Sequence, residues 1–183
     1  MTPVPPRQFA RHVALHEAGH AVAYWDHGLS FRYVTMRPRQ PGVVALVKPY
    51  PRVNDTPAKL IACMEIAAAG RIAQFHCFSS APRDDAALLA QFAQAAAMKP
   101  PASDWDPDIR QFVGAGKALD EHQCGPTGPD GWLRIWRGAE EKITGGLWPA
   151  VEAVGSKLMV STRSLTYGEV AEIAAAATSS PVH

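Results

Sequence analysis

Residues that would share one face of an α-helix recur at three- and four-residue steps between positions 8 and 27. These residues are Phe9, Val13, His16, His20 and Tyr24. Gly28 follows them, and glycine commonly ends a helix because it adopts a left-handed backbone conformation at no steric cost. The pattern therefore predicts a helix from about Gln8 to His27, with two histidines on an otherwise apolar face.

Two short runs of strand-forming residues follow this helix. Residues 31–36 are mostly β-branched or aromatic and end before Pro38, and residues 43–47 form an apolar run that precedes Pro49. The second run is too short for a typical helix. The two runs predict adjacent strands in a β-hairpin. The strand over residues 33–37 would also offer an edge on which an extended peptide could pair.

Helical signals dominate the remainder of the chain. Pro57 after Asp55 and Thr56 is typical of a helix start. Thr166 stands three residues before Glu169, which is the spacing of a capping box. We expect helices over residues 57–75, 84–98, 107–119 and 149–159, further helix before the glycine pair at 145–146, and a last helix after residue 166.

These elements predict a mainly α (α+β) fold, a helical domain with one small β-hairpin or sheet. A turn-rich loop is expected over residues 124–131, and Trp132 and Trp136, four residues apart, are expected in the core. A chain of 183 residues is long enough for one domain with a buried core. We expect a single domain over residues 1–183, with a Pro-rich tail at 1–7 and a C-terminal tail at 178–183.

The charge balance argues against two classes of partner. Lys and Arg number 18, Asp and Glu number 17, and the formal net charge is +1. A chain so close to neutrality has no bulk electrostatic attraction for nucleic acid or for an anionic membrane surface. No apolar run reaches the ~18 residues that a membrane span needs, and the N-terminal residues lack the apolar centre of a signal peptide. We expect no nucleic acid partner, no membrane span and a cytoplasmic location.

The segment His16-Glu17-Ala18-Gly19-His20 carries the strongest chemical signal in the chain. On a helix, residues four apart lie on one face, so both imidazoles can bind a single Zn²⁺ ion. Glu17 can then act as the general base toward a zinc-bound water, whose pKa zinc lowers to roughly 7. As core histidines, His16 and His20 would each need a buried hydrogen-bond partner. The motif predicts zinc ligands at His16 and His20 and a catalytic base at Glu17.

A catalytic zinc ion usually has three protein ligands, so a third is expected elsewhere in the chain. The candidates are Glu65 on the second predicted helix, and Asp84 and Asp85 at the start of the third. The two aspartates also have a simpler explanation, because carboxylates at a helix start complement the helix dipole. Arg71 could pair with an acidic residue near the site. We interpret the acidic segment 104–108 as ordinary helix-start chemistry.

Several segments, in order along the chain, resemble one peptidase family. They include the zinc motif itself, a strand-like Tyr-Val-Thr-Met-Arg-Pro-Arg segment, and Ala-Ala-Gly-Arg-Ile-Ala, similar to a family segment that reads A-G-R-x-A-E. The matching segments are residues 16–22, 33–39, 68–73, 148–154 and 165–170. This pattern resembles family M41, the protease domain of FtsH-type ATP-dependent membrane proteases. The resemblance covers most of the chain apart from residues 100–130, and the zinc motif is its most specific part.

The resemblance implies a zincin-like fold with an aspartate as the third zinc ligand. Residues 80–85 fall where the family has a G-A-S-N-D-like segment that carries this aspartate. Choosing Asp85 as the ligand places Leu89 and Phe92 on positions that the family fills with small or apolar residues. The resemblance therefore favours Asp85 over Asp84.

The resemblance also implies an activity. We expect a zinc metalloendopeptidase that hydrolyses peptide or unfolded protein substrates, with His16, His20 and Asp85 holding zinc and Glu17 activating water. No Gly-x-x-x-x-Gly-Lys-[Ser/Thr] phosphate loop occurs in the chain. We therefore expect a stand-alone, ATP-independent domain that lacks the AAA+ ATPase and the membrane anchor of familiar members. The alternative is a regulatory or interaction module that keeps the zinc-binding fold with little or no turnover.

Overall fold

The computed structural model describes residues 6–37, 46–49, 56–78, 83–97, 106–122 and 127–179. The helices in these ranges are α1 (Pro6–Asp26), α2 (Pro57–Phe78), α3 (Asp85–Ala97), α4 (Pro107–Glu121), α5 (Gly128–Thr144), α6 (Trp148–Val160) and α7 (Tyr167–Ser179). The strands are β1 (Phe31–Thr35) and β2 (Leu46–Pro49). The predicted fold class is confirmed, because the chain is mainly α-helical with one small β element.

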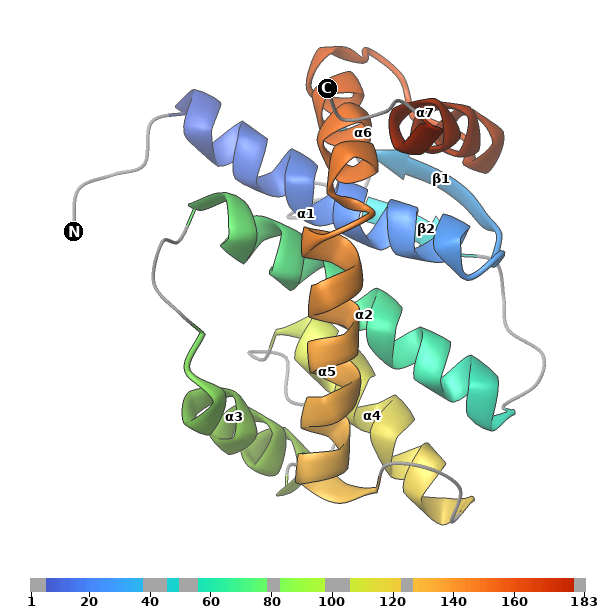
Figure 1. The fold of residues 1–183 in the computed structure, drawn as a ribbon. Helices are drawn as coiled ribbons and strands as arrows, with labels where there is room; N and C mark the ends of the chain where they lie inside the picture. The colour runs from blue at the N-terminus through green and yellow to red at the C-terminus, as the bar shows by residue number, and fades with distance from the viewer. Residues whose placement is uncertain are drawn as a thin grey trace.

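Helices α1 and α2 form the centre of the fold. α1 packs against α2 and α6, and α2 packs in addition against α4 and α5; Figure 1 shows α1 across the upper part of the molecule and α2 beneath it. Ala14, Ala18 and Ala69 have no exposed surface. A Cβ atom on Gly19 would lie only 2.5 Å from the carbonyl oxygen of Ala69. The small residues therefore let the backbones of α1 and α2 approach closely.

The two strands pair as predicted. β1 and β2 are antiparallel neighbours, with Val34 opposite Val47. The second strand covers residues 46–49, whereas the sequence predicts 43–47, and residues 43–45 lie outside the described part of the chain.

The other edge of β1 is occupied. The Val34 N–H donates to the Leu165 carbonyl, and the Leu165 N–H donates to the Val34 carbonyl, both at 2.9 Å. β1 therefore lies between β2 and the segment before α7. The expectation that this strand offers an open edge to a peptide is wrong at Val34.

Local capping chemistry is clear at the starts of α4 and α7. The Asp106 carboxylate accepts the backbone N–H groups of Asp108 and Ile109 at the start of α4. At α7, the Thr166 N–H donates to the Glu169 carboxylate at 2.9 Å, and the Glu169 N–H donates to Thr166 Oγ1 at 3.4 Å. The predicted capping box and the predicted helix-start role of the acidic segment at Asp106 are both confirmed.

Helix boundaries depart from the predictions at both ends and near residue 128. α1 begins at Pro6 and α7 ends at Ser179, so each helix extends into a segment that the sequence assigns to a tail, 1–7 and 178–183. α5 begins at Gly128, inside the expected loop over 124–131. Pro129 suits this helix start, because the first N–H groups of a helix have no partner in the helix.

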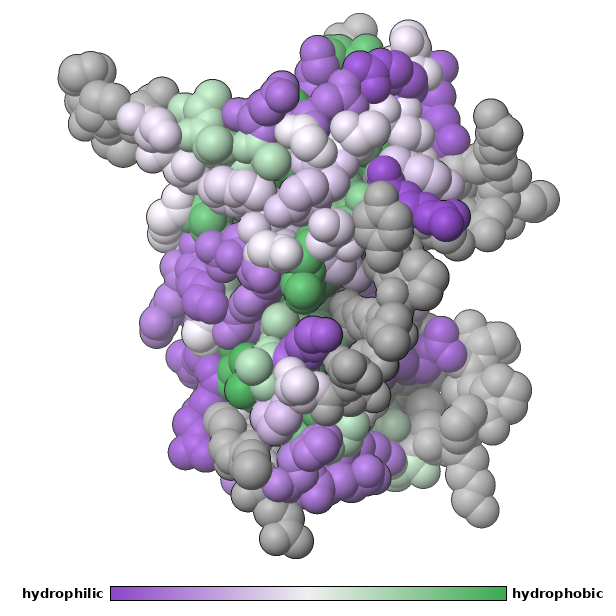
Figure 2. Space-filling view, turned by 90° about the vertical axis from the view of Figure 1, so that its right-hand side faces the viewer, coloured by the Kyte–Doolittle hydropathy of each residue, from purple (hydrophilic) through white to green (hydrophobic). Residues whose placement is uncertain are grey.

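An aromatic cluster joins α3, α4 and α5. The rings of Phe92 and Phe112 stack with centroids 4.8 Å apart, and Trp136 meets Phe112 edge-on at 5.2 Å. Trp132 and Trp136 are 3% and 2% exposed, so their predicted core position is confirmed. On the face in Figure 2, hydrophobic residues appear only in small separate patches. None of the helices in the described ranges has the length and hydropathy of a membrane span.

Candidate metal centre

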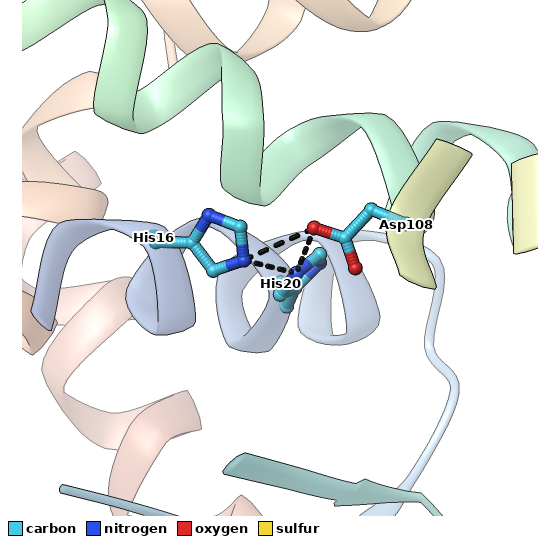
Figure 3. A group of neighbouring side chains, drawn as sticks. All are labelled: His16, His20 and Asp108. Atoms are coloured by element: carbon cyan, nitrogen blue, oxygen red, sulfur yellow. Dashed lines mark hydrogen bonds and ion pairs between the residues drawn. The ribbon is translucent and has the colours of Figure 1, made fainter. Parts of the chain in front are cut away.

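α1 places His16 and His20 one helical turn apart, and α4 brings Asp108 to them, as Figure 3 shows. The two Nε2 atoms are 3.2 Å apart. Asp108 Oδ2 lies 3.0 Å from His16 Nε2 and 3.4 Å from His20 Nε2. Within the described ranges, these are the only three His, Cys, Asp or Glu side chains whose ligand atoms converge in the manner of a metal site. We call them the Asp108 cluster.

The spacings in the Asp108 cluster fit a tetrahedral zinc site. Ligand atoms bound roughly 2.0–2.1 Å from a zinc ion at tetrahedral angles lie about 3.3–3.4 Å from one another. The three distances between ligand atoms in the cluster are 3.2, 3.0 and 3.4 Å. Two imidazole nitrogens and one carboxylate oxygen are donors that zinc accepts, and three of them leave a fourth position for water or substrate.

Helix α2 orients the imidazole of His20. Its Nδ1–H donates to the Ile66 carbonyl at 2.7 Å, which leaves Nε2 directed at Asp108. A Cβ atom on Gly70 would lie 2.7 Å from His20 Cε1 and closer still to Nε2, so only glycine fits beside the ring. His16 has no comparable anchor in the described part of the chain, where its buried Nδ1 finds no hydrogen-bond partner.

The charges within the Asp108 cluster stabilise one another. Burial alone would lower the pKa of His20, but the Asp108 carboxylate raises it to about 9. Burial would also raise the pKa of the Asp108 carboxyl, but the charge on His20 and hydrogen bonds from both histidines hold it well below its usual range. Without a metal, a protonated His20 therefore pairs with the Asp108 carboxylate at neutral pH. A divalent cation would replace this proton, because metals bind neutral imidazole.

Glu17 is buried beside the two histidines on α1. It is 9% exposed, and burial raises its pKa, while the charges of His20 and His16 oppose that rise. Its carboxylate also accepts the backbone N–H of Val47 on β2. A carboxylate with a raised pKa takes up and returns a proton more readily near neutral pH than an ordinary one.

The outer edge of β2 faces Glu17. The N–H and C=O of Val34 bond to Leu165, so they point away from β2. Val34 and Val47 are therefore a non-hydrogen-bonded pair, in which the backbone groups of each residue point away from the other strand. The Val47 N–H consequently points outward, which is how it reaches Glu17. The strand edge beside the site belongs to β2, not to β1.

The aspartates at the start of α3 are not brought to the histidines. Asp85, the predicted third ligand, pairs with Arg137 of α5. Asp84 Oδ1 accepts the backbone N–H groups of Ala86 at 3.0 Å and Ala87 at 3.2 Å, so it caps α3. The geometry places Asp108, and not Asp85, in the position of a third ligand.

Glu65, the other predicted candidate, belongs to a separate ion-pair group. Its Oε2 lies 2.8 Å from His27 Nε2 and 2.7 Å from Lys142 Nζ. We call His27, Glu65 and Lys142 the Glu65 cluster. Burial would raise the pKa of Glu65, but hydrogen bonds from His27 and Lys142 lower it overall. This carboxylate already has two donors, neither of which belongs to the Asp108 cluster.

Sequence reasoning missed Asp108 because it treated the acidic segment 104–108 as one helix-start signal. That interpretation holds for Asp106, whose side chain caps α4. One capping carboxylate is sufficient for a helix start. The second acid, Asp108, is therefore not needed as a cap, and this was the signal that could have pointed to another role. Its separation from His16 and His20 along the chain gave no local spacing to connect them.

Comparison with known proteins adds no relative: no protein-family model matches the chain, and no curated protein matches it. The resemblance to family M41 therefore rests on the sequence segments alone.

Proposed function

We propose that the protein is a zinc-dependent metallopeptidase, similar to family M41, that hydrolyses peptide bonds without ATP. The observation that carries the proposal is the convergence of His16 Nε2, His20 Nε2 and Asp108 Oδ2. The buried carboxylate of Glu17 lies beside them on α1. Three ligand atoms for one metal ion, with a carboxylate base next to them, are the parts that metal-assisted hydrolysis needs.

The residues of the site would divide the work as follows. His16, His20 and Asp108 would hold a zinc ion, which supplies Lewis-acid polarisation of a carbonyl group and lowers the pKa of water. Glu17 would accept a proton from water while the water oxygen bonds to the peptide carbonyl carbon. It would then give that proton to the amide nitrogen as the C–N bond breaks. One water molecule is consumed, and a carboxylic acid and an amine are released.

We infer that the substrate is an extended peptide or an unfolded protein. The outer edge of β2 lies next to Glu17, where the Val47 N–H already donates to the Glu17 carboxylate. An extended chain could add to this edge by main-chain hydrogen bonds to its other outward groups, such as the Val47 C=O. A peptide paired there would run past the Asp108 cluster. Folded proteins rarely expose a free strand, which favours unfolded substrates in the cytoplasm.

The test compares wild type with Glu17→Gln and Asp108→Asn on an unstructured protein such as casein. Wild type is expected to bind about one zinc ion, to cleave casein, and to lose cleavage when a chelator is added. Glu17→Gln should keep zinc but lose hydrolysis by about 10²- to 10⁴-fold, because it lacks the base. Asp108→Asn should bind zinc poorly.

Two results would overturn the proposal in different ways. Zinc bound by wild type without cleavage of casein would favour the regulatory zinc-binding module. Absence of zinc from wild type, even after incubation with the metal, would make the Asp108 cluster a structural ion pair.

A further inference from the structure

Arg71 connects α2 to the start of α4. Its Nη1 lies 3.1 Å from Asp106 Oδ2 and also donates to Gln91 Oε1 at 3.4 Å. Arg71 follows Gly70 directly, the residue that contacts the His20 ring. Two consecutive residues of α2 therefore lie beside His20 and beside the start of α4, the helix that carries Asp108.

Asp106 uses its two carboxylate oxygens for different purposes. Oδ1 accepts the backbone N–H of Asp108 at 2.9 Å and that of Ile109 at 3.5 Å, and so caps α4. Oδ2 pairs with Arg71. The same side chain therefore holds the backbone at Asp108 and ties it to α2.

Both His20 and the first turn of α4 are attached to α2. α2 fixes His20 through the Ile66 carbonyl, and it fixes the first turn of α4 through Arg71 and Asp106. We propose that Arg71 is a positioning residue that acts through Asp106 to hold Asp108 at the distance a metal ion requires. The inference rests on the proposed function, because it assigns Arg71 to the zinc site.

A stabilising role alone would give a different result from a positioning role. The side chains of Arg71 and Asp106 are 31% and 39% exposed, and exposed ion pairs contribute little to folding stability. Metal sites, in contrast, depend on ligands held within about 0.5 Å of their working geometry. Loss of Arg71 should therefore weaken metal binding much more than it lowers thermal stability.

The experiment measures zinc affinity of the full chain, by competition with a chromophoric chelator, for wild type, Arg71→Ala and Asp106→Asn. Asparagine still caps a helix, but its side-chain amide no longer offers a carboxylate to Arg71. Both variants are expected to bind zinc about 10- to 100-fold more weakly. The double variant should be no weaker than either single one, because both changes break the same link.

Arg137→Ala is the matched control. It removes another Arg–Asp pair, the one between Arg137 and Asp85, which does not reach α4. Its zinc affinity should equal that of wild type. Cobalt absorption spectra report the coordination geometry, and we expect them to change in Arg71→Ala and Asp106→Asn but not in Arg137→Ala. Arg71→Lys keeps the positive charge but on a side chain of different length and shape, so its zinc affinity should lie between those of wild type and Arg71→Ala.

The measurements distinguish failure of the proposed function from failure of the role proposed for Arg71. Failure of wild type to bind zinc would overturn the proposed function. Zinc binding by wild type, with equal affinity and equal cobalt spectra in Arg71→Ala and Asp106→Asn, would overturn only the role of Arg71. Should Arg71→Ala not fold, Asp106→Asn decides the question by the same measurements.

Discussion

The Asp108 cluster and the Glu65 cluster are built from similar parts and differ in one partner. In each cluster, one or two histidines on α1 or directly after it lie 2.8–3.4 Å from a carboxylate on another helix. In the Glu65 cluster, the carboxylate oxygen also meets the ammonium group of Lys142. In the Asp108 cluster it meets two imidazoles, whose nitrogens can exchange a proton for a metal ion, as an ammonium group cannot. The partners of the two carboxylates therefore distinguish Asp108, a candidate metal ligand, from Glu65, which is ion-paired.

The largest expected effect is the loss of zinc in Asp108→Ala. Removing a direct ligand should weaken zinc binding by more than the roughly 10- to 100-fold seen when an outer partner is removed. Glu65→Ala should keep the wild-type zinc content. Elemental analysis of the two variants, purified side by side with wild type, makes the comparison. Zinc lost from Glu65→Ala but kept in Asp108→Ala would reverse our assignment of the two clusters.

Gly70→Ala should disturb the Asp108 cluster and leave the Glu65 cluster unchanged. The added methyl group overlaps the His20 ring, so we expect weaker zinc binding and a loss of about 1–3 kcal/mol in the free energy of unfolding. Gly114→Ala, on α4 with open space around it, is the matched control. It should raise stability by roughly 0.5–1 kcal/mol, because alanine favours helix. Urea unfolding with zinc titration would measure both, and equal behaviour of the two variants would contradict the close contact at His20.

The Glu65 cluster should weaken at acid pH. Its hydrogen bonds lower the pKa of Glu65 from 4.5, so the carboxylate stabilises the fold above pH 4.5, and this contribution is lost as pH falls through the lowered pKa. Glu65→Gln should therefore be less stable than wild type at pH 7, by about 1 kcal/mol. The difference should shrink when unfolding is measured at successively lower pH below 4.5. A difference independent of pH would show that the charge of Glu65 contributes nothing.

The smallest effect is expected from Lys142→Met. The Lys142 side chain is 48% exposed, and such a pair contributes less than about 1 kcal/mol to stability. The variant should keep one zinc ion per chain, because His27 and Glu65 supply only two ligands. Thermal unfolding and zinc content test this. A second zinc ion per chain would mean that Lys142 alone keeps a metal out of the Glu65 cluster.

Local signals in the sequence were sufficient for much of the fold. The apolar periodicity gave α1, and the Thr166–Glu169 spacing gave the start of α7, since both depend on contacts within a few residues. The start of α5 at Gly128 was missed because the turn-forming residues around it, including Pro129 in the first turn, suit a helix start as well as a loop. Boundaries of this kind depend on packing against other helices.

The candidate metal centre shows the same division between local and distant contacts. His16, Glu17 and His20 lie within one helix, and the motif brings them together by its spacing. Asp108 reaches them only because α2 packs against both α1 and α4. Small residues at Gly19 and Gly70 make the packing of α1 against α2 possible, and their role becomes visible only when both helices are placed.

The two backbone hydrogen bonds between Val34 and Leu165 limit how far the chain can be shortened from its C-terminal side. A chain ending before Leu165 would lose both hydrogen bonds to β1, along with the contact between Phe31 and Tyr167. β1 would then expose unpaired N–H and C=O groups, and such an edge invites other chains to pair with it. Truncated forms of this protein should therefore aggregate through β1, even though the missing segment contributes no residue to the candidate metal centre.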